Sequence, residues 1–300
     1  MPERDDPPAS ELFGEERSAE VVAASFAGTP DPRLRHVLTS LVRHLHDFVK
    51  DVELTGEEWA AAIGFLTRTG QTCTDTRQEF ILLSDVLGVS MLVETINNRA
   101  VDGLTESTVE GPFHVVASPR RELGATIAED GLGTPCLVTG SVSGADGRPV
   151  PGAQVDVWQA NDEGFYDVQQ PDVQPHRNLR GLFTADGDGR FRFRSIVPRH
   201  YPIPADGPVG QLLAATARHP NRPAHIHFEV SAPGYRTVTT HLFVAGTPYL
   251  GSDAVFGVKP SLVREFPLVD DPERAAAEGL PNPFRGVHFD VVLSPSDGAR

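Results

Sequence analysis

The stretches Leu137-Val138-Thr139-Gly140-Ser141-Val142 and Ala153-Gln154-Val155-Asp156-Val157-Trp158 decide the fold class. Each alternates with a period of two residues, which predicts two β-strands. The run Gly144-Ala145-Asp146-Gly147-Arg148-Pro149 between them consists of turn residues. A second predicted strand pair flanks Asp186-Gly187-Asp188-Gly189, a strong hairpin signal. Short strands joined by turns, without helices between them, predict an antiparallel β-sandwich.

Further strands are expected at 225–231, 237–244 and 286–293, whereas residues 31–99 have the period of helices. A helix that begins after Asp31-Pro32 carries the apolar residues Leu34, Val37, Leu38, Leu41, Leu45, Phe48 and Val49. Thr55 and Glu58 form a capping box for a second helix. Asp75 and Gln78 would open a third helix, with an apolar stripe of Phe80, Leu83, Leu87 and Met91. A shorter helix is expected near 15–27. The chain is therefore predicted to be mainly β, with a helical domain at 1–105 and a β-sandwich catalytic domain at 106–300.

Composition excludes several classes of protein. The 300 residues include 26 basic and 41 acidic side chains, a formal net charge of −15. This balance argues against binding to nucleic acid or to anionic membranes. Nowhere do roughly 18 apolar residues follow one another, so no membrane span is expected. The first residues lack the basic flank and apolar stretch of a signal peptide. Two cysteines, Cys73 and Cys136, make no disulfide framework, so a cytoplasmic location is expected.

His225-Ile226-His227 is the sharpest local motif. In a strand, residues i and i+2 project from the same face, so both imidazoles could bind one metal ion while Ile226 and Phe228 point into the other layer. By itself, this motif more often represents two ordinary histidines on a polar face.

Two tyrosines change that balance. Tyr166 and Tyr201 lie in polar or proline-rich loops and belong to no apolar stripe. A loop tyrosine usually packs its ring and hydrates its hydroxyl. With a pKa of about 10, a phenol becomes a metal ligand only beside a strongly Lewis-acidic ion. Two imidazoles and two phenolates suit ferric iron better than zinc.

Several separated stretches together resemble the intradiol ring-cleavage dioxygenases of the catechol 1,2-dioxygenase type, which are non-haem iron(III) enzymes. The resemblance covers about residues 30–293. The matching stretches are Thr108-Val109-Glu110-Gly111-Pro112-Phe113, 151–161, Arg180-Gly181-Leu182-Phe183, Arg222-Pro223-Ala224-His225-Ile226-His227 and Tyr249-Leu250-Gly251-Ser252-Asp253.

The resemblance implies specific roles for residues of this chain. Tyr166, Tyr201, His225 and His227 would hold Fe(III). Arg222 and Tyr201 would be catalytic, with Arg222 stabilising developing negative charge and Tyr201 accepting a proton of the diol. His241 would support the iron ligands without binding the iron itself. The expected substrate-lining residues are Leu82, Asp85, Val109, Gly111, Pro112, Phe113, Ile203, Pro204 and Val255.

Within the family, the hydroxyquinol-cleaving subgroup is the most similar, on the stretches 80–88 and 253–259. This implies cleavage of hydroxyquinol with O2 between adjacent hydroxyl-bearing carbons, giving 3-hydroxy-cis,cis-muconate or maleylacetate. Asp85 could accept a hydrogen bond from the third hydroxyl. His241 stands where many catechol-cleaving relatives carry glutamine, and Glu110 is acidic where apolar residues are usual.

Other functions stay open. Catechol or a substituted catechol could be the substrate instead. The segment around 152–158 also resembles transthyretin-like modules, which bind ligands without catalysis, and a hydrolase using metal-bound water at His225 and His227 is a further alternative. The apolar stripes of the N-terminal helices exceed what one sheet face needs, so a homodimer through these helices is expected; the alternative is that they cover the sandwich. The resemblance also implies that such helices form a dimer interface and can enclose a lipid-like molecule.

Overall fold

The computed structural model describes residues 13–75, 77–99, 103–115 and 118–296. The chain divides into two compact units, with the boundary between Arg68 and Thr69 in helix α3 (Gly56–Thr72). The domain boundary expected after residue 105 stays a prediction.

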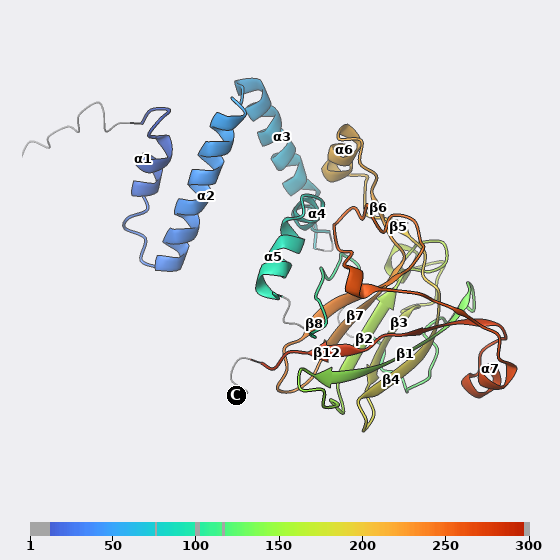
Figure 1. Ribbon diagram of the computed structural model, residues 1–300. Coiled ribbons are helices and arrows are strands. Elements are labelled where there is room, and N and C mark those ends of the chain that lie inside the picture. Colours follow the sequence, from blue (N-terminus) through green and yellow to red (C-terminus); the bar gives the residue numbers. More distant parts are fainter. Residues whose placement is uncertain (1–12, 76, 100–102, 116–117, 297–300) are drawn as a thin grey trace, which may run out of the picture. The chain divides into compact units, whose positions relative to one another are not determined.

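The first unit consists of α1 (Ser18–Ala24), α2 (Pro32–Asp51) and most of α3, and α1 lies beside α2 (Figure 1). Asp31 is the N-cap of α2, and its carboxylate accepts a hydrogen bond from the backbone N–H of Arg33 at 2.8 Å. The predicted capping box before α3 is present. Thr55 Oγ1 accepts from the Glu58 N–H at 3.2 Å, and the Glu58 carboxylate accepts from the Thr55 N–H at 2.9 Å.

The expectation of one helix along Phe80, Leu83, Leu87 and Met91 is wrong. Two helices form instead, α4 (Glu79–Val86) and α5 (Val89–Asn97), and Gln78 makes no side-chain capping bond. Gly88 between them has φ +73°, a left-handed conformation that favours glycine and ends a helix. The predicted stripe does not share one environment, since Leu83 and Met91 are buried while Phe80 and Leu87 are exposed.

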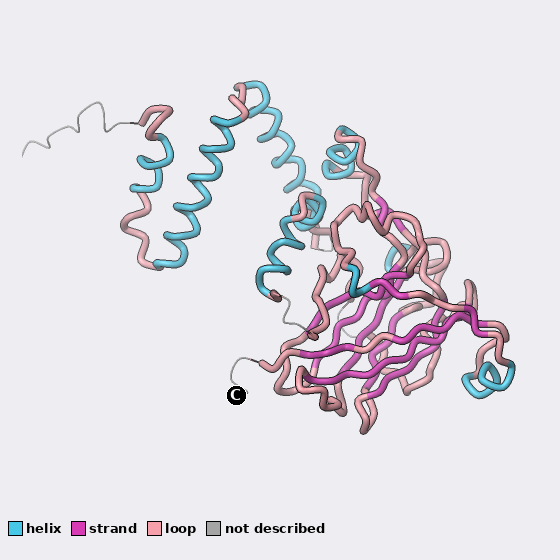
Figure 2. Tube along the Cα trace, viewed as in Figure 1, coloured by secondary structure: helices cyan, strands magenta, loops and turns pink. Residues whose placement is uncertain are grey.

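The rest of the second unit is built on two layers of strands (Figure 2). One sheet has the order β10-β11-β1-β12, with β4 also paired to β1, and the other has the order β3-β2-β7-β8-β9. The strands are β1 (Pro135–Gly144), β2 (Gln154–Gln159), β3 (Arg180–Thr184), β4 (Arg190–Ile196), β7 (His225–Ser231), β8 (Val238–Val244), β9 (Val263–Arg264), β10 (Leu268–Val269), β11 (Phe284–His288) and β12 (Val291–Leu293).

The inner faces of the two sheets share one apolar core, as a sandwich requires. Phe183 of β3 stacks on Phe193 of β4 with ring centroids 5.2 Å apart, and Phe228 of β7 lies 5.2 Å from Phe289 of the opposite layer. The outer face of the first sheet is covered by α7 (Pro272–Glu278), whose Ala275 packs with Leu137.

The sheets are mixed, which corrects the expectation of a purely antiparallel sandwich. β1 runs parallel to both β11 and β12, and β8 runs parallel to β9. The long connections before β9 and β11 free these strands from the antiparallel direction that a hairpin imposes. The strand expected at 286–293 is two strands, because Asp290 interrupts it and its carboxylate accepts from the Ser141 N–H at 2.9 Å.

Short elements complete the second unit. They are the paired strands β5 (Tyr201–Pro202) and β6 (Asn221–Arg222), helix α6 (Pro208–Ala215) and the 3-10 turns η2 (Asp167–Gln169) and η3 (Pro260–Leu262). α4 is linked to α6, since the Val209 N–H donates to the Glu79 carboxylate at 3.1 Å. No helix within the described ranges is long and apolar enough to cross a membrane.

Candidate active site

The outer face of the second sheet carries the predicted histidines. Strand β7 alternates as expected, because Ile226 and Phe228 lie in the core between the sheets while His225 and His227 project from the other face. Across the sheet, Trp158 of β2 and His241 of β8 are the register partners of His227. Three neighbouring strands therefore bring a row of aromatic rings to one place.

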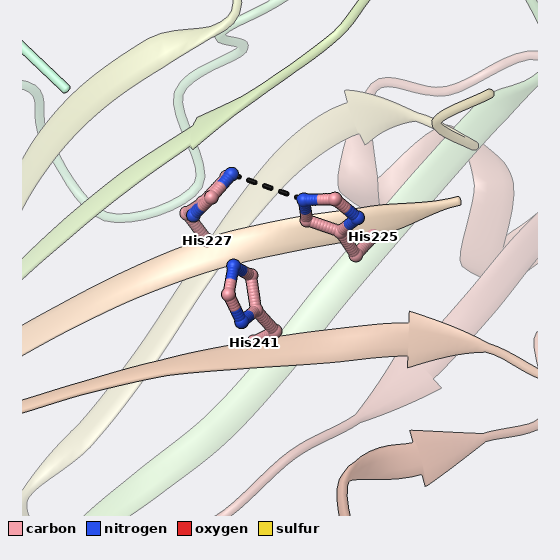
Figure 3. Close-up of side chains that lie close together, drawn as sticks. All are labelled: His225, His227 and His241. Carbon is pink, nitrogen blue, oxygen red and sulfur yellow. Dashed lines mark hydrogen bonds between the residues drawn. The ribbon is translucent and has the colours of Figure 1, made fainter. Parts of the chain in front are cut away.

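Two imidazole nitrogen atoms of this row are in close contact. The Nε2 atoms of His225 and His227 lie 3.0 Å apart, with His241 beside both (Figure 3). His225 Nδ1 donates to the carbonyl of Pro223 at 2.7 Å, so its Nε2 carries a free lone pair. Burial holds the pKa values of all three histidines well below the ordinary value. They are neutral near pH 7, the form in which imidazole binds a metal ion.

The two predicted tyrosines reach the same point from other elements. Tyr166 lies in the loop after β2, and its hydroxyl is 3.0 Å from His227 Nε2. Tyr201 lies in β5, and its hydroxyl is 3.4 Å from His225 Nε2. Both side chains are buried, and their rings pack edge to face. The four side chains predicted as ligands therefore converge on one place.

This donor set fits a metal ion. Burial raises the pKa of both phenols, which would stay protonated here without a strongly Lewis-acidic cation nearby. The close approach of two neutral imidazole nitrogens also fits two ligands of one ion. Oxygen and nitrogen donors without a thiolate suit ferric iron.

Arg222 lies beside the four side chains. It is held by Asp253, and the sequence did not indicate this contact. β5 pairs with β6 so that Arg222 lies opposite Tyr201, and its Nη1 is 3.4 Å from His225 Nε2. Asp253 accepts from Arg222 Nε at 3.1 Å and from Nη2 at 3.4 Å, and also from the Gly257 N–H at 2.9 Å. Asp253 and the nearby Gly257 predict a turn, but they do not indicate a contact with the distant Arg222.

His241 differs from the other two histidines in its contacts. Its Nδ1 forms a short hydrogen bond with Thr108 Oγ1, and its Nε2 is buried with no partner among the described residues. One nitrogen of His241 lies within 4.8 Å of nitrogens of His225 and His227. The side chain therefore lies beside the two predicted ligand histidines, and its supporting role stays a prediction.

Two predicted pocket residues lie directly on this site. Phe113 stacks on Tyr166 with ring centroids 4.7 Å apart. Gly111 has φ +82°, and a Cβ there would lie 3.1 Å from His227 Cε1, so glycine lets the loop approach that ring. Asp85 is buried close enough to Arg222 and Asp253 to interact with both charges, and burial raises its pKa.

The other predicted pocket residues differ in exposure. The Val255 N–H donates to Asp253, which ties Val255 to the Arg222 side of the site. Leu82 and Ile203 are buried, Val109 and Pro204 are partly exposed and Pro112 is exposed. A cavity of about 460 Å³ borders the site through Asp253 and is also lined by Arg218, His219 and Phe256.

Comparison with known proteins covers both parts of the chain. The family profile described as "Dioxygenase" matches residues 109–295, and that described as "Catechol dioxygenase N terminus" matches residues 31–105. A hydroxyquinol 1,2-dioxygenase from Rhizobium sp. (strain MTP-10005) is 55% identical over 283 residues, which cover 94% of this chain and 96% of the relative.

Solved structures of dioxygenases also match this chain over most of its length. The structure of hydroxyquinol 1,2-dioxygenase from Pseudomonas putida DLL-E4 matches with a TM-score of 0.87 at 49% identity, covering 94% of this chain and 99% of that one. Catechol 1,2-dioxygenase from Acinetobacter sp. ADP1 matches with a TM-score of 0.79 at 31% identity, covering 94% and 92%.

Proposed function

This chain belongs to the intradiol ring-cleavage dioxygenase family, and from that premise we propose that it cleaves hydroxyquinol with O2 between its two adjacent hydroxyl-bearing carbons. The product would be 3-hydroxy-cis,cis-muconate or its tautomer maleylacetate. The observation that carries the proposal is the convergence of two phenols and two imidazoles beside a buried arginine. The 55% identity to a hydroxyquinol 1,2-dioxygenase supports the choice of substrate.

The proposed cofactor is a non-haem ferric ion held by Tyr166, Tyr201, His225 and His227. Bound ferric iron would supply the Lewis acidity and the electron-accepting capacity that activate an aromatic diol. His241 supports this ligand set through its packing against both ligand histidines, with ring centroids 4.2 and 4.6 Å away.

Two side chains would act on the substrate. As a phenolate, Tyr201 accepts one proton of the diol, and the guanidinium of Arg222 opposes the rise that burial causes in its pKa. Arg222 is buried and aimed by Asp253, so its positive charge is held in place before negative charge develops on the substrate. Trp158 and Phe113 cover the ligands and keep water away from them.

Asp85 would select the substrate. Its carboxyl group is buried on α4, close to Arg222, and could accept a hydrogen bond from the third hydroxyl of hydroxyquinol, which catechol lacks. A site that holds a polar group for one hydroxyl rejects the analogue without it, since the buried group is left unpaired. The other proposed substrate-lining residues are Leu82, Val109, Gly111, Pro112, Phe113, Ile203, Pro204 and Val255.

Oxygen uptake tests this function. Hydroxyquinol should be consumed faster than catechol at equal concentration. Asp85→Asn should lower kcat/KM for hydroxyquinol by about ten- to a hundredfold, the worth of a charged hydrogen bond, with little change for catechol. An equal fall for both substrates would mean that Asp85 only supports the fold, and faster cleavage of catechol would favour the alternative substrate.

The helices of the first unit would have a separate role. Six large apolar side chains of α2 are 42–54% exposed in a single chain, namely Leu34, Val37, Leu41, Leu45, Phe48 and Val49. Such a contiguous apolar face marks an interaction surface. We propose that the protein is a homodimer through these helices, which could also enclose a lipid-like molecule.

A further inference from the structure

A second group of ionisable side chains lies on the outer face of the same sheet. Glu110 and His114 belong to the loop before β1, and their Oε1 and Nδ1 atoms are 2.6 Å apart. Glu229 comes from β7, and one ligand atom from each of these three residues lies within 4.8 Å of the others. None of the three is among the proposed iron ligands.

A fourth residue, Asp156 of β2, forms no close ion pair within the described part of the chain, although Arg180 and His114 lie near it. Asp156 and Glu229 are register partners on β2 and β7, so two carboxylates lie side by side on one face, an arrangement that is unfavourable when both are ionised. Asp156 is only 9% exposed, and its Oδ1 makes no close hydrogen bond in the described part of the chain. Burial raises the pKa of its carboxyl group, and the Ser118 hydroxyl, His114 and Arg180 oppose that rise. The nearby Arg180 is engaged by Asp167 at 2.7 Å.

The position of Asp156 connects it to the other three. The carboxylates of Asp156 and Glu229 both interact electrostatically with His114, which lies above the sheet with its ring centroid 4.7 Å from that of Trp158. Glu110, His114 and Glu229 thus offer donors that one cation could bridge, and the Asp156 carboxylate lies next to Glu229 on the same face of the sheet.

We propose that Glu110, His114, Asp156 and Glu229 form a second metal site, which binds a divalent first-row transition ion such as Zn²⁺ or Mn²⁺. The imidazole favours these ions over Mg²⁺ and Ca²⁺, which prefer oxygen ligands alone. Carboxylate oxygens and one imidazole nitrogen are common ligands of zinc. The alternative is that a protonated His114 alone balances the three carboxylates.

The site would join the loop before β1 to two strands of the second sheet. The loop that carries Glu110 and His114 also carries Gly111 and Phe113, which touch the His227 and Tyr166 rings. A cation shared with Glu229 and Asp156 would tie this loop to two strands of the sheet. Bound metal would therefore stabilise one wall of the candidate active site without entering it.

Calorimetric titration of the purified protein, with its iron in place, tests the proposal with Zn²⁺ as the probe. One Zn²⁺ per chain should bind while the iron content and visible absorption stay unchanged. Glu229→Gln and Glu110→Gln should each weaken Zn²⁺ binding by at least about tenfold, since even residues behind a ligand contribute ten- to a hundredfold. Glu122→Gln removes the same charge from an exposed site elsewhere and should leave the affinity unchanged.

Zn²⁺ should also raise the melting temperature of the wild type more than that of either variant, because a ligand stabilises the state that binds it. Two results would overturn the proposal: no stoichiometric binding while iron is retained, or equal affinity in the wild type and in Glu110→Gln. Because Glu110 is exposed, that variant is expected to fold even where Glu229→Gln does not. The readout is metal binding and not activity, so it stands apart from the proposed ring cleavage.

Discussion

Helix α2 and strand β7 use their apolar side chains in opposite ways. Every residue of β7 except Glu229 and Ser231 is buried, with the apolar ones in the sandwich core and the histidines in the site. By contrast, α2 has 20 residues and none of them is buried. The strand completes its core within one chain, whereas the helix leaves its apolar face uncovered.

This difference places the candidate active site in the second unit and the proposed dimer contact on helix α2. The residues that meet at the site all come from the second unit, and burial there controls their pKa values and holds their geometry. The apolar face of α2 contributes nothing to that burial in a single chain, so its stabilising contribution requires a partner. Changes in one region should therefore leave the property of the other intact.

Tyr166→Phe should have the largest effect. Removal of one hydroxyl from the four donors should abolish the visible absorption of iron bound to phenolate and lower kcat/KM by roughly a thousandfold or more. Metal analysis, absorption spectra and oxygen uptake measure this, with Tyr235→Phe as the matched control in a partly buried position. Retained colour and activity would remove Tyr166 from the ligand set. The size of the assembly should not change.

Leu41→Glu combined with Leu45→Glu tests the other side of the comparison. Each leucine withdrawn from an interface costs about 1.5–3 kcal/mol, so the dimer should dissociate at micromolar concentration. Light scattering detects the change, and oxygen uptake should continue. Leu132→Glu, at an exposed leucine of the second unit, is the control and should remain dimeric. A monomeric wild type would contradict the proposed dimer.

Asp253→Asn tests whether Asp253 positions the guanidinium of Arg222, which is the proposed catalytic charge. The amide still fits beside Arg222 but no longer neutralises it, so kcat should fall by about ten- to a hundredfold, with a smaller change in KM. The iron absorption should persist, because Asp253 touches no proposed ligand. Asp172→Asn, at an exposed position, is the control. Loss of the iron absorption would show that Asp253 supports the fold of the site instead.

A small effect is expected from Asp206→Asn, at a surface contact of the second unit. Arg77 donates to Asp206 at 3.0 Å and holds the pKa of that carboxyl below its ordinary value of 3.8. A lowered pKa stabilises the folded state above the ordinary value, and this contribution is lost as the pH falls through the folded-state pKa. The variant should therefore melt slightly lower than the wild type at pH 6, and the difference should shrink near pH 3.

The local periods of the sequence predicted the helical region and the main strands, but not α6, α7 or the short strands β5, β6, β9 and β10. They placed His225 and His227 on one face of β7. They also predicted the starts of α2 and α3, because capping depends on residues only two or three positions apart. The proposed iron ligands were inferred from a family resemblance spread over several stretches, and in the structure their four side chains lie together.

The tertiary structure alone decided the contacts between distant segments. Strand direction and register depend on packing across the whole sandwich, so no local pattern indicated that β1 runs parallel to β11 and β12. For the same reason, no local pattern indicated that Arg222 pairs with Asp253 or that Asp156 lies opposite Glu229. The sequence by itself determined the starts of α2 and α3, the main strands and the chemical character of the faces of β7. Only long-range packing decided which faces meet, because its free energy arises between residues that are far apart in the chain.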